Sequence, residues 1–213
     1  GRLGAMVFGD VSRERLALNE STMFTGGPYQ PFNPEALKHL QEVRRLIFAH
    51  EFAKAEDLAH RNMMAEPYLQ MSFQPVGDIW INFHHQMIVT DYRRSLDLDS
   101  AVATTTYISG GVRYTREAFA SPISGVIVYR ITADQPGAVV FDVGLSSPQL
   151  GEAEPSTQDT IAFFGTNRRE QGVPGALKFG FAARVLNDGG SLTSSPDTLR
   201  LRGADSALIL VDA

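Results

Sequence analysis

The sequence of 213 residues contains no cysteine. Disulfide bonds, thiolate metal sites and cysteine nucleophiles are therefore excluded. It also lacks any apolar run near the roughly 20 residues that a membrane-spanning helix needs, and no signal-peptide pattern opens the chain. We expect no membrane partner. Both ends resemble strand interiors, so we expect each end to lie within folded structure.

Basic charge is scarce. Lys and Arg total 19 against 24 Asp and Glu, which gives a formal net charge of -5. Proteins that bind nucleic acid need a concentrated basic face, whereas the arginine pairs of this chain are scattered. We therefore expect no nucleic-acid partner.

Catalytic motifs are also missing. The chain has neither a glycine-any-serine-any-glycine elbow nor a glycine-rich phosphate loop with its lysine. No two histidines form the one-turn pair of a helical zinc site, and His84 and His85 in one strand would point to opposite faces. Asp97 and Asp99 share a side, but solvent exposure is favoured over a catalytic pair. We expect no metal and no cofactor.

The apolar content is that of an ordinary globular protein, with 43% hydrophobic and 20% charged residues. Alternating apolar and polar residues predict strands at 15–19, 79–83 and 102–108, and a β-branched run predicts another at 126–131. Gly110-Gly111 and residues 187–190 are typical of hairpin turns.

One segment has helical spacing instead. Asn33 is a candidate N-cap, Pro34 suits the first helical position, and Leu37, Leu40 and Ile47 recur at three- and four-residue spacing along one face. A second helical pattern continues to about Met64. The pattern predicts a helical hairpin or one broken helix.

Together these patterns predict a mainly β fold. We expect one domain over residues 1–213, a large antiparallel β-sandwich of two sheets with a short helical insertion near residues 34–64. The stretch 146–175 is rich in Gly, Pro, Glu, Gln and Ser. We expect it to be largely an exposed excursion.

Several segments, in order along nearly the whole chain, resemble the start of glycoside hydrolase family 95, which comprises α-L-fucosidases and some α-galactosidases. The segments that carry the resemblance lie at residues 2–9, 18–28, 33–37, 43–48, 74–78, 91–98 and 112–117. No single segment is diagnostic, but their common order makes chance a poor explanation.

The resemblance implies a multi-domain enzyme of which this chain is the N-terminal β-sandwich. A helical linker, an (α/α)6 barrel and a C-terminal β domain would follow. It also implies an inverting mechanism whose glutamic acid and aspartate network belong to the barrel, so we carry no catalytic residue onto this chain. The implied partners are that barrel and a fucosylated oligosaccharide, and the implied location is periplasmic or secreted.

The polar, glycine-rich loop after the second predicted strand is the candidate site. The family commonly has tryptophan where this chain has Phe24, so an indole N–H donor is absent there. One interpretation is that the loop faces the barrel and shapes the rim of the sugar site; the other is a structural turn whose glycines supply positive φ. The candidate residues are Asn19, Glu20, Thr22, Phe24, Gly26 and Gly27.

Two other functions remain open. The chain could be a free-standing carbohydrate-binding module, with Trp80 as a stacking platform, although packing is the favoured role for that ring. It could also be a complete small enzyme. Binding of free fucosylated glycans would favour the module, turnover by the isolated chain would favour the enzyme, and a large exposed apolar patch would favour the accessory domain.

Overall fold

The computed structural model describes residues 2–84, 88–155 and 157–213. The chain divides into two compact units. The larger unit comprises Gly1–Phe24, Phe73–Asn167 and Leu177–Ala213, and the smaller comprises Thr25–Ser72 and Arg168–Ala176. None of the helices in the described part of the chain is long and apolar enough to span a membrane.

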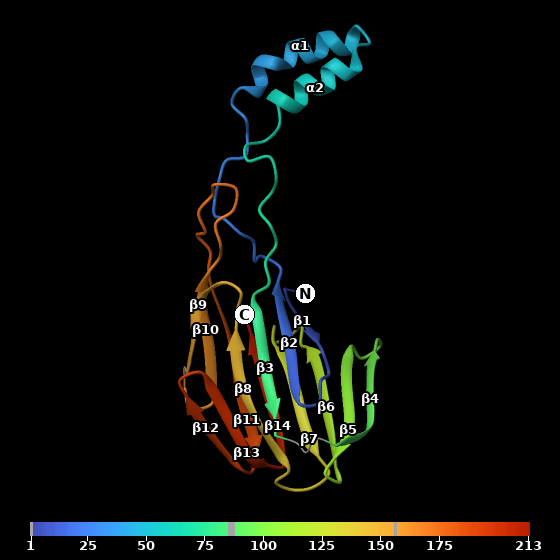
Figure 1. Cartoon of the computed structure of the whole chain (residues 1–213), viewed down its shortest axis with the longest axis vertical. Coiled ribbons are helices and arrows are strands. Elements are labelled where there is room, and N and C mark those ends of the chain that lie inside the picture. The colour runs from blue at the N-terminus through green and yellow to red at the C-terminus, as the bar shows by residue number, and fades with distance from the viewer. Residues whose placement is uncertain (1, 85–87, 156) are drawn as a thin grey trace. The chain divides into compact units, whose positions relative to one another are not determined.

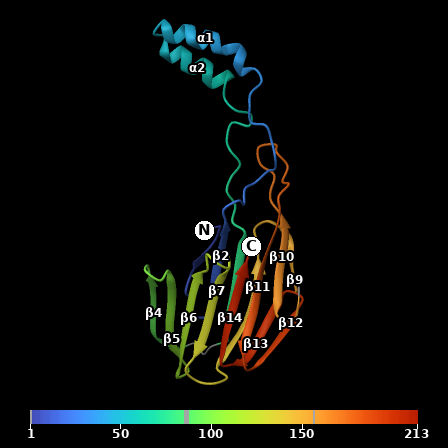
Figure 2. The same cartoon turned by 180° about the vertical axis from the view of Figure 1, so that it is seen from behind.

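The larger unit contains two antiparallel sheets (Figures 1 and 2). Strands of the six-stranded sheet follow the order β1 (Leu3–Val7), β2 (Arg13–Glu20), β3 (Gly77–Phe83), β8 (Val139–Ser146), β13 (Thr198–Ala204) and β12 (Ser191–Ser195). Strands of the eight-stranded sheet follow the order β4 (Val89–Asp97), β5 (Val102–Ser109), β6 (Val112–Ala120), β7 (Ile127–Ala133), β14 (Ser206–Asp212), β11 (Lys178–Asp188), β10 (Thr160–Thr166) and β9 (Leu150–Pro155). The predicted two-sheet, mainly β fold is confirmed.

The core follows from the two-residue period of the strands. In β3, Ile79 and Ile81 are fully buried, while Trp80 between them faces outward and is half-buried. The same alternation in β2 buries Leu16 and Leu18 completely. Each such side chain contributes about 1.5–3 kcal/mol when it leaves water. The hydrophobic pattern therefore fixes which face of each strand turns inward.

Two expectations about connections were wrong. The stretch 146–175, which we expected to be an exposed loop, contains strands β9 and β10. Burial of Ile161, Ala162 and Phe163 stabilises β10 in the sheet. Glycine is needed there for close packing: a Cβ at Gly151 would lie 2.2 Å from the carbonyl oxygen of Phe164. The turn at residues 187–190 is not a hairpin, since it joins β11 to β12 in the other sheet.

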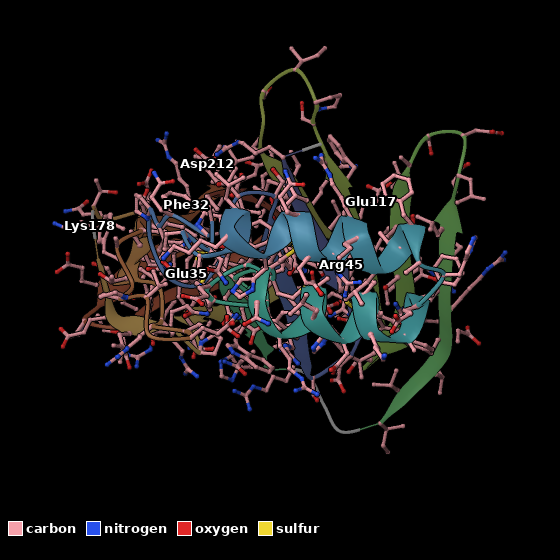
Figure 3. All side chains as sticks on the ribbon, turned by 90° about the horizontal axis from the view of Figure 1, so that it is seen from above. Phe32, Glu35, Arg45, Glu117, Lys178 and Asp212 are labelled. Carbon is pink, nitrogen blue, oxygen red and sulfur yellow. The ribbon has the colours of Figure 1, made fainter. Side chains whose placement is uncertain are left out.

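The smaller unit contains the predicted helical hairpin. Helix α1 spans Ala36–Phe48 and α2 spans Phe52–Asn62, and the two helices lie side by side (Figure 3). Helix α1 begins two residues later than expected, because the side chain of Asn33 accepts a hydrogen bond from the backbone N–H of Glu35 and forms a turn before the helix. Within the described helices, only Leu46 and Ala55 are buried.

A buried ion pair joins the two sheets of the larger unit. Glu14 of β2 and Arg116 of β6 have fully buried side chains, with 3.7 Å between Oε2 of Glu14 and an Nη of Arg116. The hydroxyl of Tyr129 on β7 donates to the same carboxylate at 3.0 Å, and the backbone N–H of Gly9 donates to its other oxygen at 2.7 Å. Ionic groups inside a core require such partners, because removal from water costs several kcal/mol per ion.

Arg116 also contacts two aromatic rings and a loop. Its guanidinium carbon lies 4.7 Å from the ring centre of Phe83 and 4.9 Å from that of Tyr107. It donates a hydrogen bond to the carbonyl oxygen of Asp10 at 2.9 Å. The side chain therefore connects β6, β3, β5 and the loop that joins β1 to β2.

Replacing Arg116 with Met should destabilise the larger unit by about 3–5 kcal/mol, because Glu14 would stay buried without its partner. Urea unfolding followed by fluorescence of Trp80, the only tryptophan, measures the change. Arg184→Met is the control: Arg184 pairs with Asp159 on the exposed surface, where ion pairs contribute less than about 1 kcal/mol. Equal losses in the two variants would contradict the role given to the buried pair.

Candidate functional site

The first part of the predicted loop lies at the end of β2. Asn19 and Glu20 end the strand, and the buried carboxylate of Glu20 accepts hydrogen bonds from the N–H of Thr22 at 2.8 Å and its hydroxyl at 2.6 Å. Burial raises the pKa of Glu20, but the two Thr22 donors and the charge of Arg2 outweigh burial and lower this pKa below its ordinary value. Glu20 is therefore an ionised hydrogen-bond acceptor rather than an acid that could protonate a leaving group.

A small open cavity of about 190 Å³ adjoins Glu20. Its polar lining includes Arg2, Thr22 and Lys178, and apolar side chains such as Met23 and Phe179 complete the wall. Glu20 is the only carboxylate side chain among its lining residues. Hydrolysis of a glycosidic bond normally needs two carboxyl groups across the sugar ring, and this cavity does not supply them.

Phe24 ends the segment and is 43% exposed. Its ring meets that of Phe73 edge to face at 5.4 Å, and the two residues form an isolated β-bridge. The side-chain amide of Asn167 donates to the carbonyl oxygen of Phe24 at 2.6 Å. The Phe24 ring therefore packs against Phe73 although it lacks the indole of the tryptophan that is common in the family.

Gly26 and Gly27 belong to the smaller unit, unlike the other candidate residues. Gly26 has φ of +70°, and its N–H donates to the carbonyl oxygen of Arg168 at 2.8 Å. A Cβ at Gly27 would lie 2.7 Å from the Cβ of Ala176. Both glycines are thus required by the local backbone, which supports the structural interpretation of this part of the loop.

Glu170 joins two chain segments beside these glycines. Its carboxylate accepts hydrogen bonds from the hydroxyl of Thr25, from the N–H of Ser72 at 2.8 Å and from the hydroxyl of Ser72 at 2.7 Å. These donors, with Thr25 first, lower the pKa of Glu170 below its ordinary value. The neighbouring Gln171 side chain bonds the backbone of Leu69 in both directions. Loop 168–176 therefore links the chain segments that precede and follow the helical hairpin.

The other acidic and histidine candidates of the described residues lie in separate places. Asp97 and Asp99 are exposed, and Asp97 accepts a hydrogen bond from the N–H of Asp99 within a turn. The side chain of His84 contacts Asp142 at 3.1 Å, while His85 lies outside the described residues. Within residues 2–84, 88–155 and 157–213, no group of three His, Asp or Glu side chains could hold a metal ion.

The side chain of Trp80 contacts neighbouring side chains of its own sheet. Its indole N–H donates to the hydroxyl of Ser146 at 2.8 Å, and the guanidinium carbon of Arg13 lies 4.1 Å from the ring centre. Arg15 also approaches the ring, at 5.4 Å. A stacked guanidinium covers the surface that a sugar would need, so the contacts favour packing as the role of this ring.

The sequence analysis missed the buried polar residues. Glu14 is in phase with Leu16 and Leu18 in β2, and Arg116 is in phase with Tyr114 and Ala118 in β6. A charged residue in phase with an apolar face was the available signal. Glu170 had no comparable signal, because its partners are distant in sequence.

Comparison with known proteins finds a match to a family of glycosyl hydrolase domains. A family model described as "Glycosyl hydrolase family 65, N-terminal domain" matches residues 1–213. The chain is 36% identical over 181 residues to "Alpha-L-fucosidase 2" of Arabidopsis thaliana, covering 84% of this chain and 21% of that protein. It is 33% identical over 141 residues to "Probable alpha-fucosidase A" of Aspergillus niger, covering 63% and 17%. The chain spans about a fifth of the length of the curated relatives it matches.

These matches confirm the resemblance drawn from the sequence, which was to the N-terminal β domain of an α-L-fucosidase-like glycoside hydrolase. The matching description names family 65, whereas the sequence segments resemble family 95. A solved structure titled "Putative kojibiose phosphorylase from human microbiome" overlaps 64% of this chain and 23% of its own, with a TM-score of 0.39 and 11% identity. That likeness carries no argument about the fold.

Replacing Gly27 with Ala should loosen the smaller unit, because the new Cβ would collide with Ala176 and approach the carbonyl oxygen of Pro174 at 3.2 Å. Overpacking of this kind costs about 1–3 kcal/mol, which should speed proteolysis within residues 28–72 by roughly 5- to 150-fold. Gly144→Ala is the control, since the nearest atom to its Cβ would be 3.7 Å away. Unchanged cleavage of the Gly27 variant would contradict this packing requirement.

Proposed function

Because the chain belongs to the family of glycosyl hydrolase family 65 N-terminal domains, we propose that it is the accessory N-terminal domain of an inverting α-L-fucosidase-like enzyme. In this proposal it packs on the catalytic (α/α)6 barrel of the same polypeptide and orients it. The substrate of the whole enzyme is a fucosylated oligosaccharide. The names and the greater length of the two fucosidase relatives support this assignment.

The observation that carries the packing role is the apolar surface of the helical hairpin. Leu37 is 77% exposed, Phe48 is 82% exposed and Phe52 is 59% exposed. Large apolar side chains exposed on one element are candidates for an interaction site. Of the predicted stripe of α1, Leu37 and Ile47 are exposed while Leu40 and Val43 are partly buried, and a barrel surface is the proposed partner of the exposed residues.

The remaining surface of the hairpin carries paired charges, which supports a single apolar docking face. Glu42 and Arg45 form an ion pair along α1, and Asp57 and Arg61 form another along α2. These four residues, with Lys54, line a shared polar hollow. Charged residues that pair with each other in solvent need no further partner, so the apolar residues are the ones that docking would cover.

The 213 residues alone should not release fucose from an α-1,2-fucosylated oligosaccharide, whereas the polypeptide extended through the predicted barrel should. The physical reason is the absence of a facing pair of carboxyl groups in the cavity beside Glu20. A fucose-release assay of both purified proteins measures the difference. Turnover by the short chain would overturn the assignment of catalysis to the barrel.

Changing the apolar residues Leu37 and Phe48 to Ser in the full-length enzyme should lower fucose release about tenfold or more. Each docked apolar side chain contributes roughly 1.5–3 kcal/mol when buried. The matched control carries Lys54→Ser and Arg61→Ser on the charged surface and should keep most of the activity. If both double variants behave alike, the apolar surface of the hairpin is not the docking face.

A further inference from the structure

The four outer edges of the two sheets differ in how they are protected. An unpaired edge offers free backbone groups to other chains, and proteins usually block it with charges, bulges or polar residues. Strand β4 has a register shift between Thr90 and Arg93, and β9 carries Glu152 and Glu154. Strand β12 is a run of serine and threonine around one leucine.

Strand β1 carries no such protection in its own sequence, and on its open side only the Val7 carbonyl has a charged partner among the described residues, Arg94 of β4. Its sequence, LGAMV, contains no charged residue, no proline and no hydroxyl group. Among the described strands it pairs only with β2, and it forms the edge of the six-stranded sheet. An apolar edge of this kind is a ready template for a further strand.

The backbone groups that face the open edge follow from the hydrogen-bond alternation of β1 and β2. Ser21 donates to the carbonyl of Arg2, and Phe8 donates to the carbonyl of Arg15. Antiparallel pairs alternate, so Gly4 and Met6 also bond to β2, while the N–H and C=O groups of Leu3, Ala5 and Val7 point outward. The carbonyl of Val7 accepts a hydrogen bond from Arg94 at 2.8 Å, which agrees with a carbonyl that points away from β2.

A partly apolar groove lies beside the same edge. Two adjoining cavities of about 260 and 350 Å³ share Ala5, Val7, Leu96 and Ala103 in their linings. The other residues of the first cavity are small or apolar, whereas Arg94 and three hydroxyl residues complete the lining of the second. One water molecule needs roughly 10–15 Å³ of such space, so the groove has room for aliphatic side chains.

We propose that the β1 edge accepts an extended strand from the part of the same polypeptide outside residues 1–213, with aliphatic side chains at alternate positions seated in the β1 groove. The inference rests on the proposed function in one respect, namely that this chain is one domain of a longer polypeptide. The relatives are about five times longer than the aligned region, so ample chain lies outside it. A strand from the same polypeptide also pairs at high effective concentration.

Hydrogen exchange of the full-length enzyme, resolved to single amides by mass spectrometry, tests the proposal. The amides of Gly4 and Met6 bond to β2 and serve as internal references. Ala5 and Val7 should exchange at least about 100-fold more slowly than unprotected amides, independently of protein concentration. Fast exchange at Ala5 and Val7 beside protected references would overturn the proposal, and protection that grows with concentration would assign the edge to a second copy instead.

A substitution pair adds a second readout. Ala5→Lys places a charge in the groove and should expose the Val7 amide to exchange, whereas Ser194→Lys on the polar β12 edge should leave it protected. Continued protection of Val7 in the Ala5 variant would contradict strand addition. Because these measurements do not involve fucose release or the hairpin, they can fail while the proposed function stands, and the reverse also holds.

Discussion

The ion pair between Glu14 and Arg116 is the interaction on which the larger unit depends. Each charge lies in a core that is otherwise apolar, and neither could stay there alone. Glu14 comes from the six-stranded sheet, while Arg116 and Tyr129 come from the eight-stranded sheet. A shift of one sheet along the other would separate these groups. Hydrophobic burial drives the two sheets together, and the polar cluster favours one register between them.

The same cluster fixes the beginning of the chain. Gly9 donates to Glu14, and the carbonyl of Asp10 accepts from Arg116, so the loop after β1 is attached to the buried ion pair. Tyr92 donates to the carbonyl of Gly9 from β4. Strand β1 is thereby held in place, while no further strand of the described chain pairs with its outer edge. A well-positioned strand with an open edge is suited to pairing, because little further ordering is needed.

The smaller unit shows a different balance of forces. Its helices bury little, and its loops depend on hydrogen bonds from Glu170 and Gln171 and on two closely packed glycines. These contacts link the segments that flank the hairpin, while Leu37, Phe48 and Phe52 on the helices stay exposed. Carboxylates such as Glu14, Glu20 and Glu170 are engaged in structural contacts, which agrees with the proposed accessory role.

The sequence by itself determined the mainly β class, the helical insertion and the family, because alternation, helical spacing and segment order are local properties. It placed β2, β3 and the turn at Gly110-Gly111 correctly. Only the tertiary structure revealed β9 and β10, where Gly151 lies against the backbone of Phe164 and Gly165 against Leu150 and Phe179. It likewise paired Glu14 with Arg116 and assigned Gly26 and Gly27 a packing role. Contacts between residues far apart in sequence decide these features, and no local pattern encodes which distant residues will meet.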